Sequence, residues 1–222
     1  MEQPIRYKIR VSYCKSSTLI FTSHRSLIDV LMRAIRRTKI PLRFTEGFSP
    51  RPKVIFTPPL PLGVLGEAEL IDIETTRYIE ESDLLESLNK ALPEGLKFTS
   101  TTNLLKGAPV LSKMIAKATY VLSPYETGSK PKIFELIESK EIIITKKAKK
   151  GKPPKDVNVR PFIHSLIEKE DGSIVAEIAA GDKTVSPLIL TSLLWPELPA
   201  NVLEHVEITR KGFISPAGIK LY

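Results

Sequence analysis

Three arginines recur at helical spacing between residues 33 and 37 of this chain. Arg33, Arg36 and Arg37 are three and four positions apart, so in a helix their guanidinium groups share one face. A guanidinium group can donate two hydrogen bonds to the oxygens of one phosphate. Three guanidinium groups on one face would therefore bind adjacent phosphates of a polyanion. Arg25 falls on the same side of the helical wheel. The alternative is an ordinary solvated helix face, in which Arg33 pairs with Asp29.

A basic turn with two prolines follows these arginines. Its sequence is Gly47-Phe48-Ser49-Pro50-Arg51-Pro52-Lys53. Each proline fixes its own φ and pushes the residue before it into extended geometry, so the turn is rigid. Arg51 and Lys53 would then form a preformed anion site, and Phe48 beside them could stack on an unpaired base. The alternative is that Phe48 plugs the core and the prolines only stiffen a loop.

His24 is the weak candidate for a catalytic residue. It follows Ser23, which can cap the helix that carries the arginines, and it projects away from the arginine face. A helix N-terminus disfavours the imidazolium ion, so a neutral His24 could accept a proton from a ribose hydroxyl. The alternative is a capping or core histidine without chemistry.

A second basic segment precedes Lys155 and contains five lysines: Lys146, Lys147, Lys149, Lys150 and Lys152. We interpret it as a hairpin tip that attracts polyanions without reading their sequence. Arg160, in the Arg-Pro sequence that closes the next strand, could join the same anion-binding surface. A solubilising loop explains the lysines equally well.

Three carboxylates at near-alternate spacing follow the turn Leu60–Val64. Glu67, Glu69 and Asp72 could bind a metal or receive a basic partner, although an exposed strand face also explains them. The sequence has no Walker, Rossmann, zinc, catalytic-triad or iron–sulfur signature, so we expect neither a metal nor another cofactor.

The composition indicates a globular protein with segregated charge. The chain has 222 residues, 42% of them hydrophobic, and a net charge of +8. Residues 1–53 hold 12 Lys/Arg against 3 Asp/Glu, whereas residues 54–107 hold 4 against 9. Such segregation favours one basic face and an anionic partner. The single cysteine, Cys14, and the lack of a long apolar run predict a cytoplasmic protein with no membrane contact.

The apolar periodicity predicts a βαββαβ order in the first half of the chain. Residues 5–13 alternate as in a half-buried strand with a basic outer face, and a helix of about 15 residues follows Ser23 and ends before Pro41. Strands at 53–57, 68–74 and 97–104 and a helix at 80–91 complete the unit.

The second half is expected to repeat this order. The predicted strands are at 115–122, at 141–146, within 157–180 and at 203–210, and the predicted helices are at 131–138 and 186–194. We therefore predict an α+β fold of two tandem ferredoxin-like units with antiparallel sheets. They would span residues 1–107 and 108–222, with residues 105–112 as the linker.

Several motifs together resemble one family. They are Phe21-Thr22-Ser23-His24, Arg33 to Arg37, Pro41-Leu42, the Gly47 to Lys53 turn, Pro61-Leu62-Gly63 and Val159-Arg160-Pro161-Phe162. They resemble the uncharacterised radical-SAM-linked domain of bacteria, which occurs as an extension of cobalamin-binding radical-SAM proteins or as a separate protein. The resemblance implies a radical-SAM partner and a link to RNA, and it assigns no catalytic residue. The chain departs from the family pattern at Ser26 and Glu46, where the family has Asp and Gln.

These observations lead to three functional hypotheses. The first is a non-catalytic RNA-binding or adaptor module that presents tRNA or rRNA to a radical-SAM enzyme or to RNA-processing machinery. The second is a protein-docking subunit of a radical-SAM enzyme without RNA contact. The third is a metal-independent endoribonuclease with His24 as general base.

Overall fold

The computed structural model describes residues 7–126, 130–146, 153–181 and 183–221. The first half contains β1(Tyr7–Lys15), α1(His24–Arg37), β2(Val54–Phe56), β3(Leu65–Thr75), α2(Glu81–Lys90) and β4(Leu96–Leu104). The second half contains α3(Leu111–Met114), β5(Lys117–Pro124), α4(Ile133–Glu138), β6(Ile143–Lys146), β7(Lys155–Asn158), β8(Ile163–Glu168), β9(Ile174–Ala179), α5(Pro187–Leu194), β10(Val206–Ile214) and β11(Lys220–Leu221). The fold is therefore mixed α+β, and its order agrees with the periodicity of the sequence.

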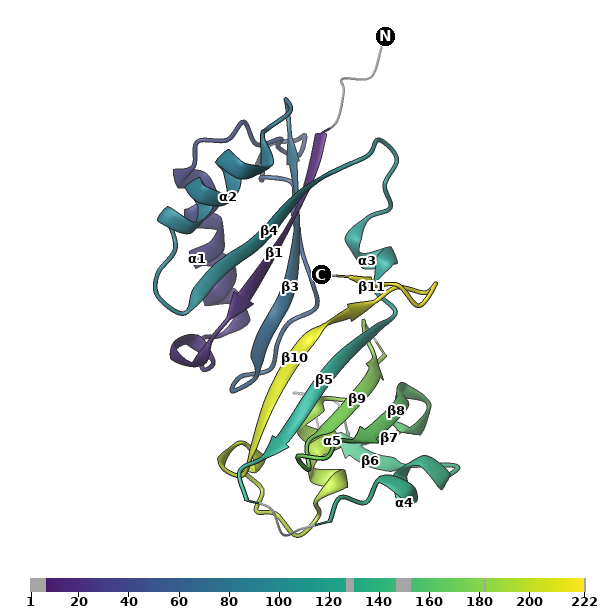
Figure 1. The fold of residues 1–222 in the computed structure, drawn as a ribbon. Coiled ribbons are helices and arrows are strands. Elements are labelled where there is room, and N and C mark those ends of the chain that lie inside the picture. Colours follow the sequence, from purple (N-terminus) through teal and green to yellow (C-terminus); the bar gives the residue numbers. More distant parts are fainter. Residues whose placement is uncertain (1–6, 127–129, 147–152, 182, 222) are drawn as a thin grey trace.

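One mostly antiparallel sheet runs through both halves (Figure 1). In the first half the order is β4-β1-β3, with β2 on β3, and every pair is antiparallel. In the second half the order is β10-β5-β9-β8, again antiparallel, with β11 on β10. Hairpin β6-β7 forms a separate two-stranded sheet.

Strand β3 joins the two halves because it has a different partner at each end. Its second part, Ile71–Ile73, pairs with β2, whereas Leu65 and Gly66 at its start pair in parallel with Thr209 and Arg210 of β10. The prediction of two tandem ferredoxin-like units is not confirmed, because the strands of both halves form one sheet. The predicted strand at 141–146 also lies outside that sheet, in the β6-β7 hairpin.

Two apolar cores pack against this sheet. Helices α1 and α2 lie on one face of β1, β3 and β4, as Figure 1 shows, and bury Leu31, Ile35 and Leu88 against Ile9 and Ile73. The second core surrounds β5, β9 and β10 and includes side chains of α4 and α5. The helices bury their apolar stripes because one face of each matches the sheet.

The prediction that β1 has a basic outer face is wrong at Arg10, whereas Lys8 is half-buried and Arg6 lies outside the described residues. Arg10 is only 9% exposed. Its Nε and Nη2 donate to the two carboxylate oxygens of Asp72 on β3, at 2.8 and 3.0 Å, and its Nη1 donates to Met114 Sδ at 3.1 Å. Met114 belongs to α3, and Leu111 at the end of the predicted linker is fully buried. The segment expected to be only a linker thus covers this face of the sheet.

Candidate functional site

Helix α1 begins where its cap predicts. Ser23 Oγ accepts a hydrogen bond from the Ser26 amide at 3.1 Å, which satisfies one of the free amides of the first turn. The apolar stripe is buried, so the arginine face must point away from the sheet. Arg33, Arg36 and Arg37 are all exposed. Arg33 Nε donates to the Asp29 main-chain oxygen at 3.2 Å and not to its carboxylate.

The basic turn is the tip of a short two-stranded loop anchored to β3. The Thr45 amide donates to Arg51 O at 2.8 Å, and the Arg51 amide donates to Thr45 Oγ1 at 3.0 Å. Further back, the Arg43 amide donates to Glu74 O and the Glu74 amide donates to Lys53 O. Hydrogen bonds of the loop residues Arg43, Thr45, Arg51 and Lys53 therefore connect the tip to Glu74, near the end of β3.

Phe48 lies at this tip and its side chain is fully exposed. The interpretation of Phe48 as a core plug is therefore wrong. Gly47 before it has φ +116°, a left-handed value that residues with a Cβ rarely adopt, so the glycine permits the bend that presents Phe48. Arg51 is exposed and Lys53 is half-buried.

The C-terminal end of α1 and segment 43–53 lie at the same end of the sheet in Figure 1. We name Arg33, Arg36, Arg37, Phe48 and Arg51 the arginine surface. Among the described residues, none of its four arginines forms an ion pair with a carboxylate. Their charges are thus available to an external anion.

Arg25 is exposed and also without an ion pair to a described carboxylate, but it is in the first turn of α1. The rise of a helix places it about 16 Å along the axis from Arg36. A ligand that bridges both residues would have to extend along the whole helix.

The Arg160 side chain is held by hydrogen bonds to main-chain oxygens of the same chain. Its Nε, Nη1 and Nη2 donate to the main-chain oxygens of Ser139, Ile163 and Ile137 at 3.1, 2.8 and 2.8 Å. All three nitrogens of the guanidinium are therefore engaged by carbonyl groups, two of them at the C-terminal end of α4. We leave Arg160 out of any anion surface for this reason.

The lysine segment is described only at Lys146, an exposed residue at the end of β6. Four further lysines of the predicted hairpin tip lie outside the described residues: Lys147, Lys149, Lys150 and Lys152. Their part in anion binding stays a prediction.

His24 lies away from the arginine surface, as its angular position on the helix predicts. It lines a cavity of about 510 Å³ together with Thr57, Pro58 and Ser112. Burial lowers the pKa of His24, and the cations of Arg210 and Lys15 lower it further, so the neutral imidazole is favoured. No carboxylate is among the described residues lining this cavity, so none is placed there to orient the imidazole.

Two of the three carboxylates predicted on an exposed strand face are buried. Asp72 pairs with Arg10, and Glu69 accepts hydrogen bonds from Arg210 and from Thr57 Oγ1. Only Glu67 is exposed, and it pairs with Lys211. Glu69 and Asp72 receive basic partners within the chain, which leaves them no role in a surface metal site.

Arg210 is a buried cation that the sequence motifs do not predict. Its Nε donates to Glu69 Oε1 at 2.7 Å, its Nη2 donates to Pro58 O at 2.8 Å, and its guanidinium lies 4.7 Å from the ring centre of Phe213. The sequence does not single it out, because the neighbouring Lys211 is also a cation and is partly exposed. Buried cations of this kind need a carboxylate nearby, which only the pairing of β3 with β10 supplies.

The geometry defines a mixed α+β protein with a mostly antiparallel sheet, exposed arginines on helix α1 and an exposed aromatic side chain on the turn that follows it. The family model described as "Uncharacterized protein conserved in bacteria (DUF2344)" matches residues 8–187, so the chain belongs to this family. A comparison with curated proteins found no match. Within the described ranges, no helix is both long and apolar enough to cross a bilayer.

Proposed function

We propose that this protein is a non-catalytic RNA-binding or adaptor module and that the arginine surface is its RNA site. Guanidinium groups at adjacent positions of a helix bind neighbouring phosphates, and an exposed ring stacks on an unpaired base. tRNA and rRNA, the RNA classes expected from the sequence, carry unpaired bases beside stacked helices. The proposal assigns phosphate binding to the arginines and base stacking to Phe48.

The observation that carries the proposal is the exposure of Phe48 beside Arg51 on an anchored tip. A large apolar side chain in water is costly, and folding normally buries it. Here main-chain hydrogen bonds hold the tip to β3 and Gly47 turns the ring outward. An aromatic ring held in this way beside unpaired cations matches the requirement of a single-stranded nucleic acid site.

The proposal also includes the identity of the partner and the assignment of each half to the ferredoxin-like fold. We infer that a radical-SAM enzyme or RNA-processing machinery receives the bound RNA, on the basis of the motif resemblance. We also infer that each half is a ferredoxin-like unit. This is supported by the antiparallel order β4-β1-β3-β2 in one half and the equivalent β10-β5-β9-β8 in the other.

Salt titration of RNA affinity tests the proposal. Fluorescence anisotropy with a labelled tRNA should show tight binding at low salt that weakens steeply as salt rises. The triple change Arg33→Ala, Arg36→Ala and Arg37→Ala should reduce the slope of log affinity against log salt by about 2 to 3, since each lost phosphate contact removes about 0.7 to 0.9.

A matched control removes three exposed cations elsewhere: Lys97→Ala, Lys106→Ala and Lys169→Ala. It should change the slope by much less. Equal effects of the two triple variants would reject the arginine surface as the RNA site. Binding of a radical-SAM partner that survives nuclease, without measurable RNA affinity, would assign the same surface to protein docking.

A further inference from the structure

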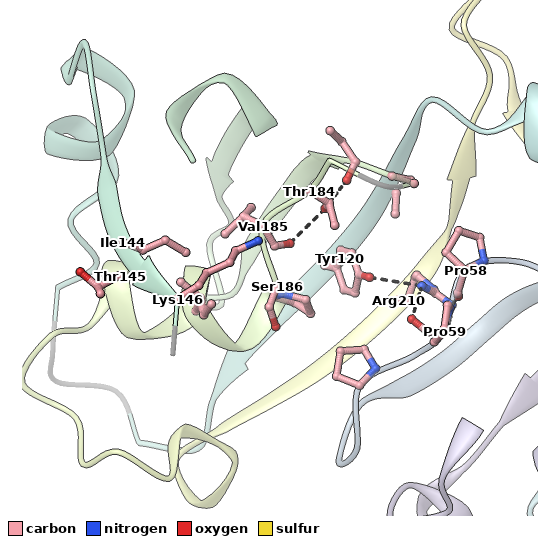
Figure 2. A pocket seen from close by; sticks show the side chains of 17 residues that line it. Pro58, Pro59, Tyr120, Ile144, Thr145, Lys146, Thr184, Val185, Ser186 and Arg210 are labelled. Carbon is pink, nitrogen blue, oxygen red and sulfur yellow. Dashed lines mark hydrogen bonds between the residues drawn. The ribbon is translucent and has the colours of Figure 1, made fainter. Parts of the chain in front are cut away.

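A cavity of about 640 Å³ lies between the two halves of the chain, beside Pro58 and Pro59 (Figure 2). Pro58, Pro59 and Pro61 of the first half form one wall. The opposite walls come from β5, from hairpin β6-β7 and from the segment that leads into α5. Pockets for drug-sized ligands have volumes of about 300 to 1,000 Å³, and this cavity falls within that range.

The walls are mainly apolar and the polar groups among them are mostly hydrogen-bond donors. Ile144, Val185, Pro187 and Ile189 supply apolar surface beside the prolines. The polar lining consists of two cations and several hydroxyl groups: Lys146, Arg210, Tyr120, Thr145, Thr184 and Ser186. The Thr145 hydroxyl already donates to Asp156 Oδ1 and the Thr184 hydroxyl to main-chain oxygens, so the other four side chains are the donors left for a ligand. No carboxylate is among the described residues that line it. The cavity thus favours a ligand with an apolar body and negatively charged acceptor groups.

The deep end of the cavity is formed by Tyr120 and Arg210, whose side chains are almost completely buried. Arg210 Nη1 has only two long contacts, to Pro59 O and to Tyr120 Oη, both at 3.4 Å. The Nε and Nη2 atoms, by contrast, are tightly bound by Glu69. Nη1 and the Tyr120 hydroxyl are therefore the groups with bonding capacity left for a ligand.

The other end is formed by Lys146 and by the start of α5. Figure 2 shows the Lys146 side chain extending across the cavity towards Val185 and Ser186. Ser186 is the N-cap of α5, but its side chain makes no capping hydrogen bond. The first-turn amides of a helix have no intrahelical acceptor, and the helix dipole adds positive potential there. Pro187 opens α5 and has no amide N–H, so the donors here are the Lys146 ammonium, the Ser186 hydroxyl and the amides of Leu188 and Ile189. Such a set suits the several oxygens of a phosphate.

We propose that this cavity binds a nucleoside 5′-phosphate, with the phosphate between Lys146 and Ser186 and the base against the prolines towards Tyr120. The Tyr120 hydroxyl and Arg210 Nη1 would then donate to acceptor atoms of the base. The site is separate from the arginine surface, and its existence does not depend on RNA binding there. The ligand is either a free nucleotide or the 5′-phosphorylated end of an RNA, which share this chemistry.

Isothermal titration calorimetry of the full chain with each of the four nucleoside 5′-monophosphates tests the site. At least one should bind saturably, and the matching nucleoside and inorganic phosphate should each bind at least tenfold more weakly. A 5′-phosphorylated tetranucleotide and its unphosphorylated form, titrated in parallel, distinguish the two sources. Saturation by the phosphorylated oligonucleotide alone assigns the cavity to an RNA end.

Lys146→Gln should weaken nucleotide binding about tenfold, which corresponds to about 1.4 kcal/mol. Lys155→Gln is the matched control, because Lys155 pairs with Lys146 across the same hairpin but does not line the cavity. Tyr120→Phe, which keeps the ring, should also weaken binding, whereas the Arg33/Arg36/Arg37 triple variant should not. Equal affinity for the phosphorylated and unphosphorylated forms of the ligand, no saturable binding of any mononucleotide or of the phosphorylated tetranucleotide up to millimolar concentration, or equal effects of the two lysine changes would overturn the proposal.

Discussion

Arg210 of β10 and Glu69 of β3 form an ion pair with both side chains only 2% exposed, although the two residues are 141 positions apart in sequence. The pair lies at the place where the two halves of the chain meet in one sheet, beside the pairing of Arg210 with Gly66. Pro58 O and Thr57 Oγ1 complete its hydrogen bonds on the first half. This contact, together with the short β3–β10 pairing, connects the halves.

Glu69→Gln should strongly destabilise the protein. Among the described residues, the change removes the one carboxylate that pairs with Arg210, and it leaves the buried guanidinium without this counter-charge. Breaking a buried pair in this way costs about 3 to 5 kcal/mol. Urea unfolding followed by circular dichroism measures the free energy of unfolding.

The chain supplies a matched control on the same two strands. Glu67 pairs with Lys211, but both side chains are partly exposed, at 54% and 42%. Glu67→Gln should therefore change the free energy of unfolding by less than about 0.5 kcal/mol, since water screens such pairs. If Glu69→Gln were as mild as Glu67→Gln, the buried pair would not connect the halves.

Gly63→Ala should cost more stability than Gly218→Ala, although both glycines have φ +79°. The left-handed backbone penalises any Cβ at either position by about 1 kcal/mol. At Gly63 the new Cβ would also lie 2.2 Å from Leu203 Cδ1, whereas at Gly218 nothing lies within 4 Å. The difference between the two unfolding free energies, expected to be about 1 kcal/mol, measures the overlap.

The double variant Gly63→Ala with Leu203→Ala separates the two contributions. Shortening Leu203 removes the atom in conflict, so the added cost of Gly63→Ala should fall to that of Gly218→Ala. An unchanged cost in the Leu203→Ala background would show that the backbone angle alone is responsible.

The stability of the protein should fall as pH decreases below neutral, in part through His24. Burial and the nearby cations lower the pKa of His24 in the folded chain below its unfolded value of about 6.5. Between the two pKa values the unfolded chain binds more protons, so stability is lost as pH falls from the unfolded value towards the folded one. Burial likewise lowers the pKa of His164, which contributes in the same direction.

His24→Gln should therefore flatten the decline in the free energy of unfolding between about pH 7 and pH 5. His24→Gln combined with His164→Gln should flatten it further. Denaturant unfolding at half-unit pH steps provides the comparison. A decline as steep in the double variant as in the wild type would contradict the lowered pKa values.

Phe48→Ala should weaken the binding of single-stranded or loop RNA with little effect on folding. Stacking of one base on an aromatic side chain contributes about 1 to 3 kcal/mol, so affinity should drop about 5- to 150-fold. The salt slope should stay unchanged because no charge is removed. Phe134→Ala, at an exposed phenylalanine of α4, is the control and should leave RNA affinity unaltered.

Helix α1 illustrates what local pattern predicts well. Its cap, its buried stripe and its exposed arginines all follow from spacing, because the helix meets the sheet through one apolar face. Strand β1 illustrates the opposite. Its alternation predicts a half-buried strand with a basic outer face, but α3 covers that face and Arg10 pairs with Asp72, 62 residues later. Alternation reports which residues share a face, and it does not report what covers that face.

The order of the elements, the segregation of basic charge and the turn that carries Phe48 can be predicted from the sequence, because they depend on residues close in the chain. Which charges are exposed and which are paired inside the fold depends on contacts between distant segments. Arg10, Arg160 and Arg210 have the same side chain as Arg33 and Arg36, yet strand pairing and carbonyl groups from distant segments engage the first three. The cavity beside Arg210 likewise exists only because β3 and β10 meet, and this pairing joins segments more than 140 residues apart.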